Sequence, residues 1–204
     1  MKGIRFVVTY SCNFMCSICR FKCAPFKKGF MPVDKFYEHF LSAFEEGYRD
    51  YIIIEGGEAF LDIARVYKYL KKIKNYCLKK YIVTNGYWGD IDIYYSVLND
   101  LKKIGLNGLI IEYDYFHKPF IQEKTILNAI RSALCNNLNV TLRALLKTDN
   151  LSCIEDTMTI KNLKDIKDKF EDLNIIFETM EQQSLKGVLN KRWALEEKLI
   201  LYDK

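Results

Sequence analysis

Three cysteines near the N-terminus have a spacing that suits a metal cluster. Cys12, Cys16 and Cys19 form a CxxxCxxC run directly after an apolar segment, residues 4–9. Three thiolates can hold three irons of a cubane [4Fe–4S] cluster, whereas a cluster that only transfers electrons is usually held by four. The fourth iron is then open to a ligand that the protein binds separately. The triplet therefore predicts chemistry at the metal.

A fourth cysteine leaves the choice of ligands open. Cys16, Cys19 and Cys23 form a CxxCxxxC triplet of their own. We favour the earlier set, because Cys12 lies only a few residues beyond the apolar segment. A tetrahedral zinc site that uses all four cysteines is the alternative to a cluster. Four ligands in so short a loop would be cramped, so we expect iron rather than zinc.

Short apolar segments that resemble strands alternate with helical patterns along the chain. The predicted strands are residues 4–9, 51–55, 80–84, 108–112, 140–146 and 174–177. The clearest predicted helix begins after Pro32 and ends before Gly47, and a last helix is expected over about 185–202. Repeated β-α units with right-handed crossovers form a parallel sheet. The sequence therefore predicts an α/β protein.

Size, composition and charge narrow the class of protein. The 204 residues fit one domain with a substantial core, and half of them are apolar. No apolar run reaches the roughly 18 residues that a membrane span needs, and the N-terminus does not resemble a signal peptide. The net charge of +5 is modest and spread along the chain. We expect one domain over residues 1–204, in the cytoplasm, with no nucleic-acid or membrane partner.

Three more motifs follow the second, third and fourth predicted strands. They are Gly56-Gly57-Glu58, Thr84-Asn85-Gly86, and Asp114 with His117. Glycines after a strand let backbone approach a ligand closely, although a plain turn is the alternative for both glycine motifs. The histidine can donate or accept a proton near neutral pH. All of these motifs fall where catalytic residues of α/β barrels lie, at the C-terminal ends of strands.

The cysteine triplet and these motifs resemble those of the radical S-adenosylmethionine (SAM) enzymes. The resemblance extends from about residue 3 to the strand near residue 177. It implies a partial (βα)6 TIM-like barrel with a [4Fe–4S] cluster and SAM as cofactors. In that family the open iron chelates the amino and carboxylate groups of SAM. The cluster then cleaves SAM reductively to a 5′-deoxyadenosyl radical, which abstracts a hydrogen atom from the substrate.

The resemblance also implies roles for individual residues. The implied cluster ligands are Cys12, Cys16 and Cys19, and the implied SAM contacts are Ile18, Gly56, Gly57, Glu58, Thr84, Asn85, Asp114 and Arg143. Ile18 stands where the family often has an aromatic residue near the adenine. Asp114 and His117 are the candidate catalytic residues. Arg143 lies in an apolar strand and needs a partner, which is either the SAM carboxylate or a nearby Glu or Asp.

The function implied by the resemblance is modification of a peptide or protein substrate. A barrel without a lid domain of its own leaves its open end accessible, which suits such a substrate. The alternatives are a glycyl-radical-enzyme activating protein, a small-molecule radical SAM enzyme, and a non-catalytic iron–sulfur or zinc-binding protein. An external reductant, flavodoxin or ferredoxin, is also implied.

Overall fold

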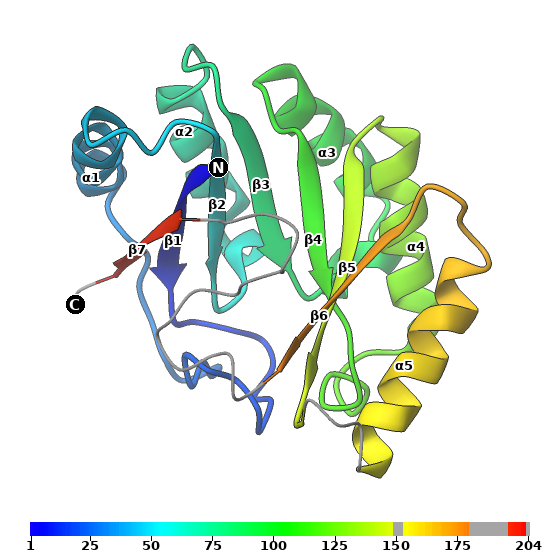
Figure 1. Ribbon diagram of the computed structural model, residues 1–204. Helices are drawn as coiled ribbons and strands as arrows, with labels where there is room; N and C mark the ends of the chain where they lie inside the picture. The colour runs from blue at the N-terminus through cyan, green and yellow to red at the C-terminus, as the bar shows by residue number, and fades with distance from the viewer. Residues whose placement is uncertain (149–152, 180–195, 203–204) are drawn as a thin grey trace.

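The centre of the molecule is one sheet of parallel strands. The computed structural model describes residues 1–148, 153–179 and 196–202. Within these residues the strands follow the order β6-β5-β4-β3-β2-β1-β7, and each neighbouring pair is parallel (Figure 1). Their bounds are β1 Lys2–Thr9, β2 Tyr51–Gly56, β3 Lys79–Thr84, β4 Gly108–Glu112, β5 Asn139–Leu146, β6 Asn174–Thr179 and β7 Glu196–Leu201.

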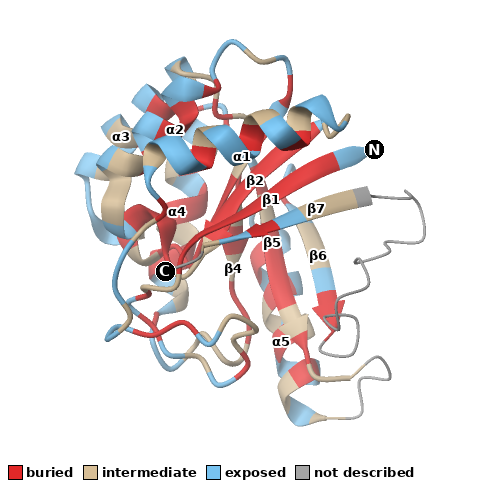
Figure 2. Ribbon diagram, turned by 90° about the vertical axis from the view of Figure 1, so that its left-hand side faces the viewer, coloured by how far each residue is buried: buried red, intermediate tan, exposed pale blue. Residues whose placement is uncertain are grey.

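Helices connect successive strands and cover the outer face of the sheet. They are α1 Val33–Glu45, α2 Ile63–Lys72, α3 Ile93–Lys103, α4 Glu123–Cys135 and α5 Ile154–Lys167, with short 3₁₀ turns η1 Ala59–Asp62 and η2 Tyr87–Asp90. Their apolar faces meet alternate strand residues, such as Ile4, Phe6 and Val8 of β1, in one large core. Figure 2 shows this interior as buried, whereas the outward sides of the helices are exposed. No helix among the described residues has the length and apolarity to cross a membrane.

The predicted fold class is confirmed. The six predicted strands and the helix after Pro32 are found within two residues of their expected bounds. Gly47 follows α1 with a φ of 96°, a left-handed conformation that glycine adopts without strain. The strands are parallel, as the β-α alternation predicts, and they form the half-barrel that the resemblance implies.

The helix expected over about 185–202 is wrong in its last part. Residues 196–201 form β7, which pairs in parallel with β1 in a register that places Lys198 beside Ile4. The first part of that prediction lies outside the described residues. The Glu-, Lys- and Leu-rich composition favours a helix when taken alone. Pairing with the free edge of β1 overrides this local preference, as tertiary contacts often do.

Candidate active site

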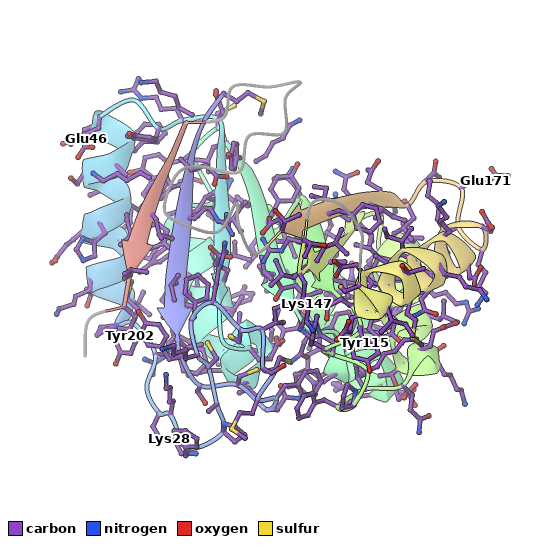
Figure 3. The ribbon with its side chains drawn as sticks, turned by 60° about the horizontal axis from the view of Figure 1, so that its bottom comes forward. Lys28, Glu46, Tyr115, Lys147, Glu171 and Tyr202 are labelled. Atoms are coloured by element: carbon purple, nitrogen blue, oxygen red, sulfur yellow. The ribbon has the colours of Figure 1, made fainter. Side chains whose placement is uncertain are left out.

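A cavity lies at the C-terminal ends of the strands, where most of the predicted site residues converge. Those that line it are Cys12, Cys16, Ile18, Cys19, Gly56, Gly57, Asn85, Asp114, His117 and Arg143. Two other predicted residues, Glu58 and Thr84, lie behind its wall. Figure 3 looks toward this end of the molecule, with Lys28 on the loop after β1 and Tyr115 and Lys147 on the loops after β4 and β5.

The long loop between β1 and α1 carries the cysteines into the cavity. Its base is closed by backbone hydrogen bonds: Cys12 N donates to Ala24 O at 3.3 Å, and Ala24 N donates to Tyr10 O at 3.2 Å. Cys12 and Cys23 are buried, and the two cysteines between them are partly exposed. All four are free thiols that line the cavity. The structure thus gathers the predicted ligands but also places Cys23 beside them.

Each of the three predicted ligand sulfurs has a hydrogen-bond donor from the chain. Cys12 Sγ accepts from the backbone N of Phe14 at 3.4 Å and from Asn85 Nδ2 at 3.8 Å. The side chain of Cys16 is hydrogen-bonded to that of His117. Cys19 Sγ accepts from the backbone N of the fourth cysteine at 3.4 Å. Such donors stabilise negative charge on sulfur, which is the form in which cysteine binds metal.

The pKa values of two of these thiols move in opposite directions. Burial raises the pKa of Cys12 to about 12. The hydrogen bond from the Cys23 side chain is the main cause that lowers the pKa of Cys19 to about 6, although burial opposes it. Cys19 therefore reaches its metal-binding thiolate form most readily of the two, and Cys12 needs the metal itself to lose its proton.

Gly56 and Gly57 join β2 to the base of the cysteine loop. Gly57 N donates to Thr9 O at 2.7 Å, and the next residue donates its N–H to Ser11 O at 2.8 Å. A Cβ atom on Gly57 would lie 1.9 Å from Ser11 O, and one on Gly56 would lie 2.3 Å from Thr9 O. The glycines are thus needed first for this close approach between two protein segments. They also line the cavity, as the interpretation as a ligand-contacting motif requires.

We expect Gly57→Ala to displace the start of the cysteine loop. The added methyl group overlaps Ser11 O, so the variant should lose about 1–3 kcal/mol of unfolding free energy and part of its iron. Urea unfolding and iron analysis after anaerobic reconstitution measure both effects. Gly47→Ala is the control for the iron content: nothing lies within 4 Å of its added Cβ, but its φ of 96° is strained for alanine, so it should lose stability and keep its iron. Full iron content in Gly57→Ala would contradict this role.

Glu58 is a buried support of the cavity wall. It is fully buried, and its carboxylate accepts hydrogen bonds from Phe60 N at 2.9 Å, Thr84 Oγ1 at 2.9 Å and Asn85 N at 2.7 Å. Burial raises its pKa to about 7 against the effect of these donors. The contact with SAM that the sequence predicts for Glu58 and Thr84 stays a prediction. In this structure both side chains are engaged with each other and position Asn85.

Buried Asp114 and half-buried His117 form a pair that ties β4 to β5. Asp114 Oδ1 lies 2.8 Å from His117 Nδ1, and Asp114 Oδ2 accepts from Leu145 N at 3.2 Å. Burial opposes charge on both groups, but their attraction outweighs it. The pKa of Asp114 is lowered, and that of His117 is raised well above its ordinary value. The pair therefore holds a protonated imidazole against Cys16 at the cavity wall.

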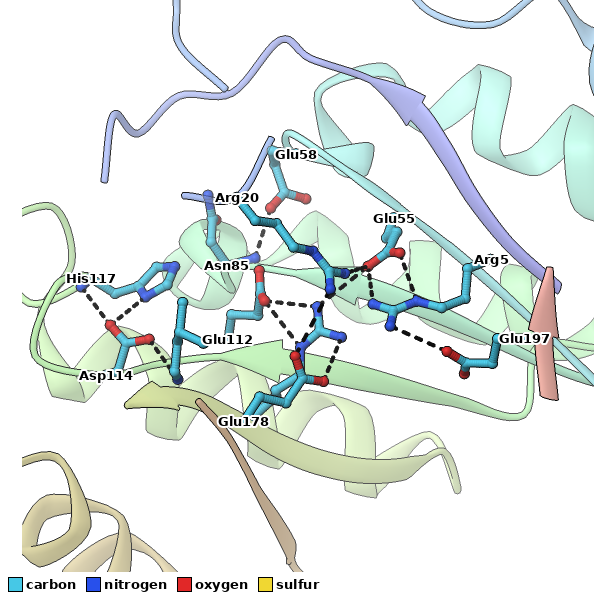
Figure 4. A network of polar contacts seen from close by, with 12 residues as sticks. Arg5, Arg20, Glu55, Glu58, Asn85, Glu112, Asp114, His117, Glu178 and Glu197 are labelled. Atoms are coloured by element: carbon cyan, nitrogen blue, oxygen red, sulfur yellow. Dashed lines mark hydrogen bonds and ion pairs between the residues drawn. The ribbon is translucent and has the colours of Figure 1, made fainter. Parts of the chain in front are cut away.

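Arg143 finds its partners within the protein. Its Nε and Nη2 donate to Glu112 Oε1 at 3.0 and 2.7 Å, and Nη2 also reaches Glu55 Oε2 at 3.5 Å (Figure 4 labels the two glutamates). Its Nη1 lies 3.6 Å from Glu178. Of the two partners predicted for this arginine, the nearby glutamate is confirmed. Contact with SAM stays a prediction, and Arg143 does line the cavity.

Arg143 belongs to a layer of seven buried or half-buried charges that spans the inside of the half-barrel. We call this set the charged layer; its members are Arg5, Arg20, Glu55, Glu112, Arg143, Glu178 and Glu197. Glu55 is its centre, with Arg5 at 2.7 Å and Arg20 at 2.8 Å. A second cavity, of about 540 Å³, lies on the N-terminal side of the layer, and Arg143 and Glu178 line both cavities.

Arg143 is the one member of this layer that was predicted as a site residue from the sequence. A usable signal was present, because Arg5, Glu55 and Arg143 are single charges within otherwise apolar strands. Successive strand residues point to opposite faces. An isolated charge in such a strand therefore indicates an inward face with partners on neighbouring strands.

The charged layer predicts acid sensitivity. The three arginines overcome the effect of burial and lower the pKa of Glu55 from 4.5 to about 2. The resulting stabilisation is complete above about pH 4.5 and is lost as the pH falls toward 2, because the unfolded chain binds the proton first. We expect up to about 3 kcal/mol from this group. Urea unfolding of cluster-free protein at pH 6 and pH 3 measures it, and equal midpoints would contradict it.

Comparison with known proteins places the chain in a family. The sequence matches the family model for the radical SAM superfamily over residues 6–160, which is most of the chain. The chain therefore belongs to the radical SAM superfamily, whose enzymes use a [4Fe–4S] cluster and SAM. The superfamily, enzyme class and cofactors expected from the sequence are confirmed.

Two relatives show the range of proteins to which the sequence is similar. It is 29% identical over 150 residues to a putative peptide biosynthesis protein, YydG, of Bacillus subtilis (strain 168). This match covers 69% of this chain and 45% of that protein. It is 30% identical over 195 residues to GTP 3′,8-cyclase of Campylobacter jejuni (strain RM1221), which covers 91% of this chain and 58% of that protein. The chain thus spans about half the length of these relatives.

Solved structures show the same fold at low sequence identity. Methylornithine synthase (PylB) has a TM-score of 0.59 and 14% identity, over 88% of this chain and 55% of that one. The methyltransferase TsrM from Kitasatospora setae, solved with cobalamin and a [4Fe–4S] cluster, has a TM-score of 0.60 and 14% identity, over 87% of this chain and 36% of that one. These likenesses support the half-barrel.

The residues present fit the cluster. Three thiols converge on one cavity, thiolates are the ligands that iron–sulfur clusters use, and each sulfur already has a hydrogen-bond donor. Cys12, Cys16 and Cys19 would hold the cluster. Gly56, Gly57 and Asn85 would face the SAM beside it. When bound, the cluster and SAM supply an electron and a radical able to abstract hydrogen.

Proposed function

We propose that this radical SAM enzyme modifies a residue of a peptide or protein. The observation that carries the proposal is the similarity to the putative peptide biosynthesis protein YydG over 69% of the chain. The proposed reaction begins with reductive cleavage of SAM and continues with hydrogen abstraction from the substrate. Flavodoxin or ferredoxin is the proposed electron donor.

The chain's own residues would prepare the site for this reaction. Asn85 and His117 hold their hydrogen bonds to Cys12 and Cys16, and Asp114 fixes the imidazole in place. The charged layer closes the floor of the cavity with paired side chains. Such a floor limits access of water from below, which protects a reactive intermediate.

A small-molecule substrate is the second candidate, favoured by the similarity to GTP 3′,8-cyclase. The charges at the cavity argue against a triphosphate. Among the described residues, each cationic side chain that lines the cavity already faces a carboxylate: Arg20 and Arg143 face the glutamates of the charged layer, and His117 faces Asp114. A phosphate chain would have to displace these partners, so we favour the peptide.

A direct assay separates the two candidates. The anaerobically reconstituted enzyme is incubated with SAM and a reductant, and 5′-deoxyadenosine is measured with no substrate, with GTP, or with a short peptide encoded beside its gene. We expect the formation of 5′-deoxyadenosine to be stimulated only by the peptide, and we expect the mass of that peptide to change. Stimulation by GTP with formation of a cyclised nucleotide would overturn it. A glycyl-radical signal on an enzyme encoded nearby would instead identify an activating protein.

A further inference from the structure

Hydrogen bonds to the three predicted ligand sulfurs come from three different parts of the fold. Asn85, which follows β3, donates to Cys12, and His117, which follows β4, is the partner of Cys16. The donor to Cys19 is Cys23, which lies in the cysteine loop itself. Of these three donors, Cys23 has no role in the proposed reaction.

Cys23 reaches Cys19 through a tight, strained turn. Lys22 N donates to Cys19 O at 3.0 Å, and Lys22 has a φ of 49°, a left-handed conformation that is uncommon for a residue with a side chain. The turn brings the N–H of Cys23 within 3.4 Å of Cys19 Sγ and places the Cys23 thiol beside the same sulfur. Strained backbone that persists in this way often belongs to a functional site.

The position of Cys23 suits a donor better than an incidental thiol. Cys23 is 4% exposed and lines the same cavity as the three predicted ligands. It is also held firmly, since its neighbour Ala24 bonds to the loop base at Tyr10 and Cys12. Cys77 and Cys135, by contrast, are exposed thiols outside the cavity.

We propose that Cys23 is a positioning residue that donates hydrogen bonds to the sulfur of Cys19 and so raises the reduction potential of the cluster. Reduction adds one electron to a cluster that already carries thiolate charge. A donor at a ligand sulfur stabilises the reduced form more than the oxidised form, and hydrogen bonds to the sulfurs are a known control of cluster potential. The inference rests on the superfamily's cluster and on Cys12, Cys16 and Cys19 as its ligands, whatever the substrate.

The test is a redox titration of the reconstituted enzyme without substrate, followed by electron paramagnetic resonance. Cys23→Ala removes the S–H donor and keeps the backbone N–H. We expect its equilibrium constant for reduction to fall by up to about tenfold, which is about 59 mV for a one-electron couple. Cys23→Ser keeps a donor and should restore the potential toward the wild-type value. Cys77→Ala, an exposed thiol, is the control and should leave the potential unchanged.

Two outcomes would overturn the inference. An unchanged potential in Cys23→Ala, with full iron, would show that the Cys23 thiol does not control reduction. Loss of iron in Cys23→Ala, to the level of Cys19→Ala, would show that Cys23 is itself a ligand. Failure of the proposed function gives a different result. If the potential shifts in Cys23→Ala but the wild-type enzyme modifies no peptide, the proposed substrate is refuted and the role of Cys23 is supported.

Discussion

Replacing Cys12, Cys16 or Cys19 by alanine is expected to abolish cluster assembly. The iron content after anaerobic reconstitution should fall from about four atoms per chain to nearly zero, because two thiolates cannot hold a cubane that normally has three or four protein ligands. Formation of 5′-deoxyadenosine should fall with it. Iron analysis and the absorption spectrum of the cluster measure the effect.

Cys23→Ala is the matched comparison, because Cys23 lies in the same loop and lines the same cavity. It should retain about four irons per chain. The opposite result, a full cluster in Cys12→Ala and none in Cys23→Ala, would show that the later triplet binds the cluster. That outcome would leave the family assignment intact and change only the choice of ligands.

Arg143→Ala is expected to lower the unfolding free energy by about 3 kcal/mol, because it removes the nearest cation from buried Glu178 and half-buried Glu112 and one of three arginines from Glu55. Arg143 is 6% exposed and faces Glu112, Glu55 and Glu178. Removal of one partner from a buried ionic network exposes the full cost of keeping the others out of water. Chemical denaturation of the purified protein measures the loss.

Lys103→Ala provides the control for this prediction. Lys103 pairs with Asp100 at 3.0 Å on the surface, where both side chains are more than half exposed. Such pairs contribute about 0–1 kcal/mol, so the variant should unfold close to the wild-type midpoint. A loss below 1 kcal/mol in Arg143→Ala would mean that the charged layer does not depend on this arginine.

Local patterns in the sequence were enough to predict most of the fold. The strands and helices follow apolar periodicity, and the predicted ligands follow a short fixed spacing within one loop. Residues 196–201 show where such reasoning fails, because their strand exists through pairing with β1 at the opposite end of the chain. No local pattern can report a partner that is almost 200 residues away.

The site shows the same division between local and long-range information. Asn85 and Glu58 were predicted alike as SAM contacts, yet one lines the cavity and the other is fully buried behind it. Which way each side chain points depends on how the ends of β2 and β3 meet. The partners of Arg143 come from three other strands, so sequence alone left open whether they belong to the protein or to the cofactor.

The ion pairs across the barrel also divide its interior into two spaces. Arg143 and Glu178 separate an upper chamber from a lower one of about 540 Å³. Among the described residues, these two side chains form a shared wall between the cysteine site and the lower chamber. Shortening either side chain would connect the two chambers into a passage, so that solvent could quench the radical from below.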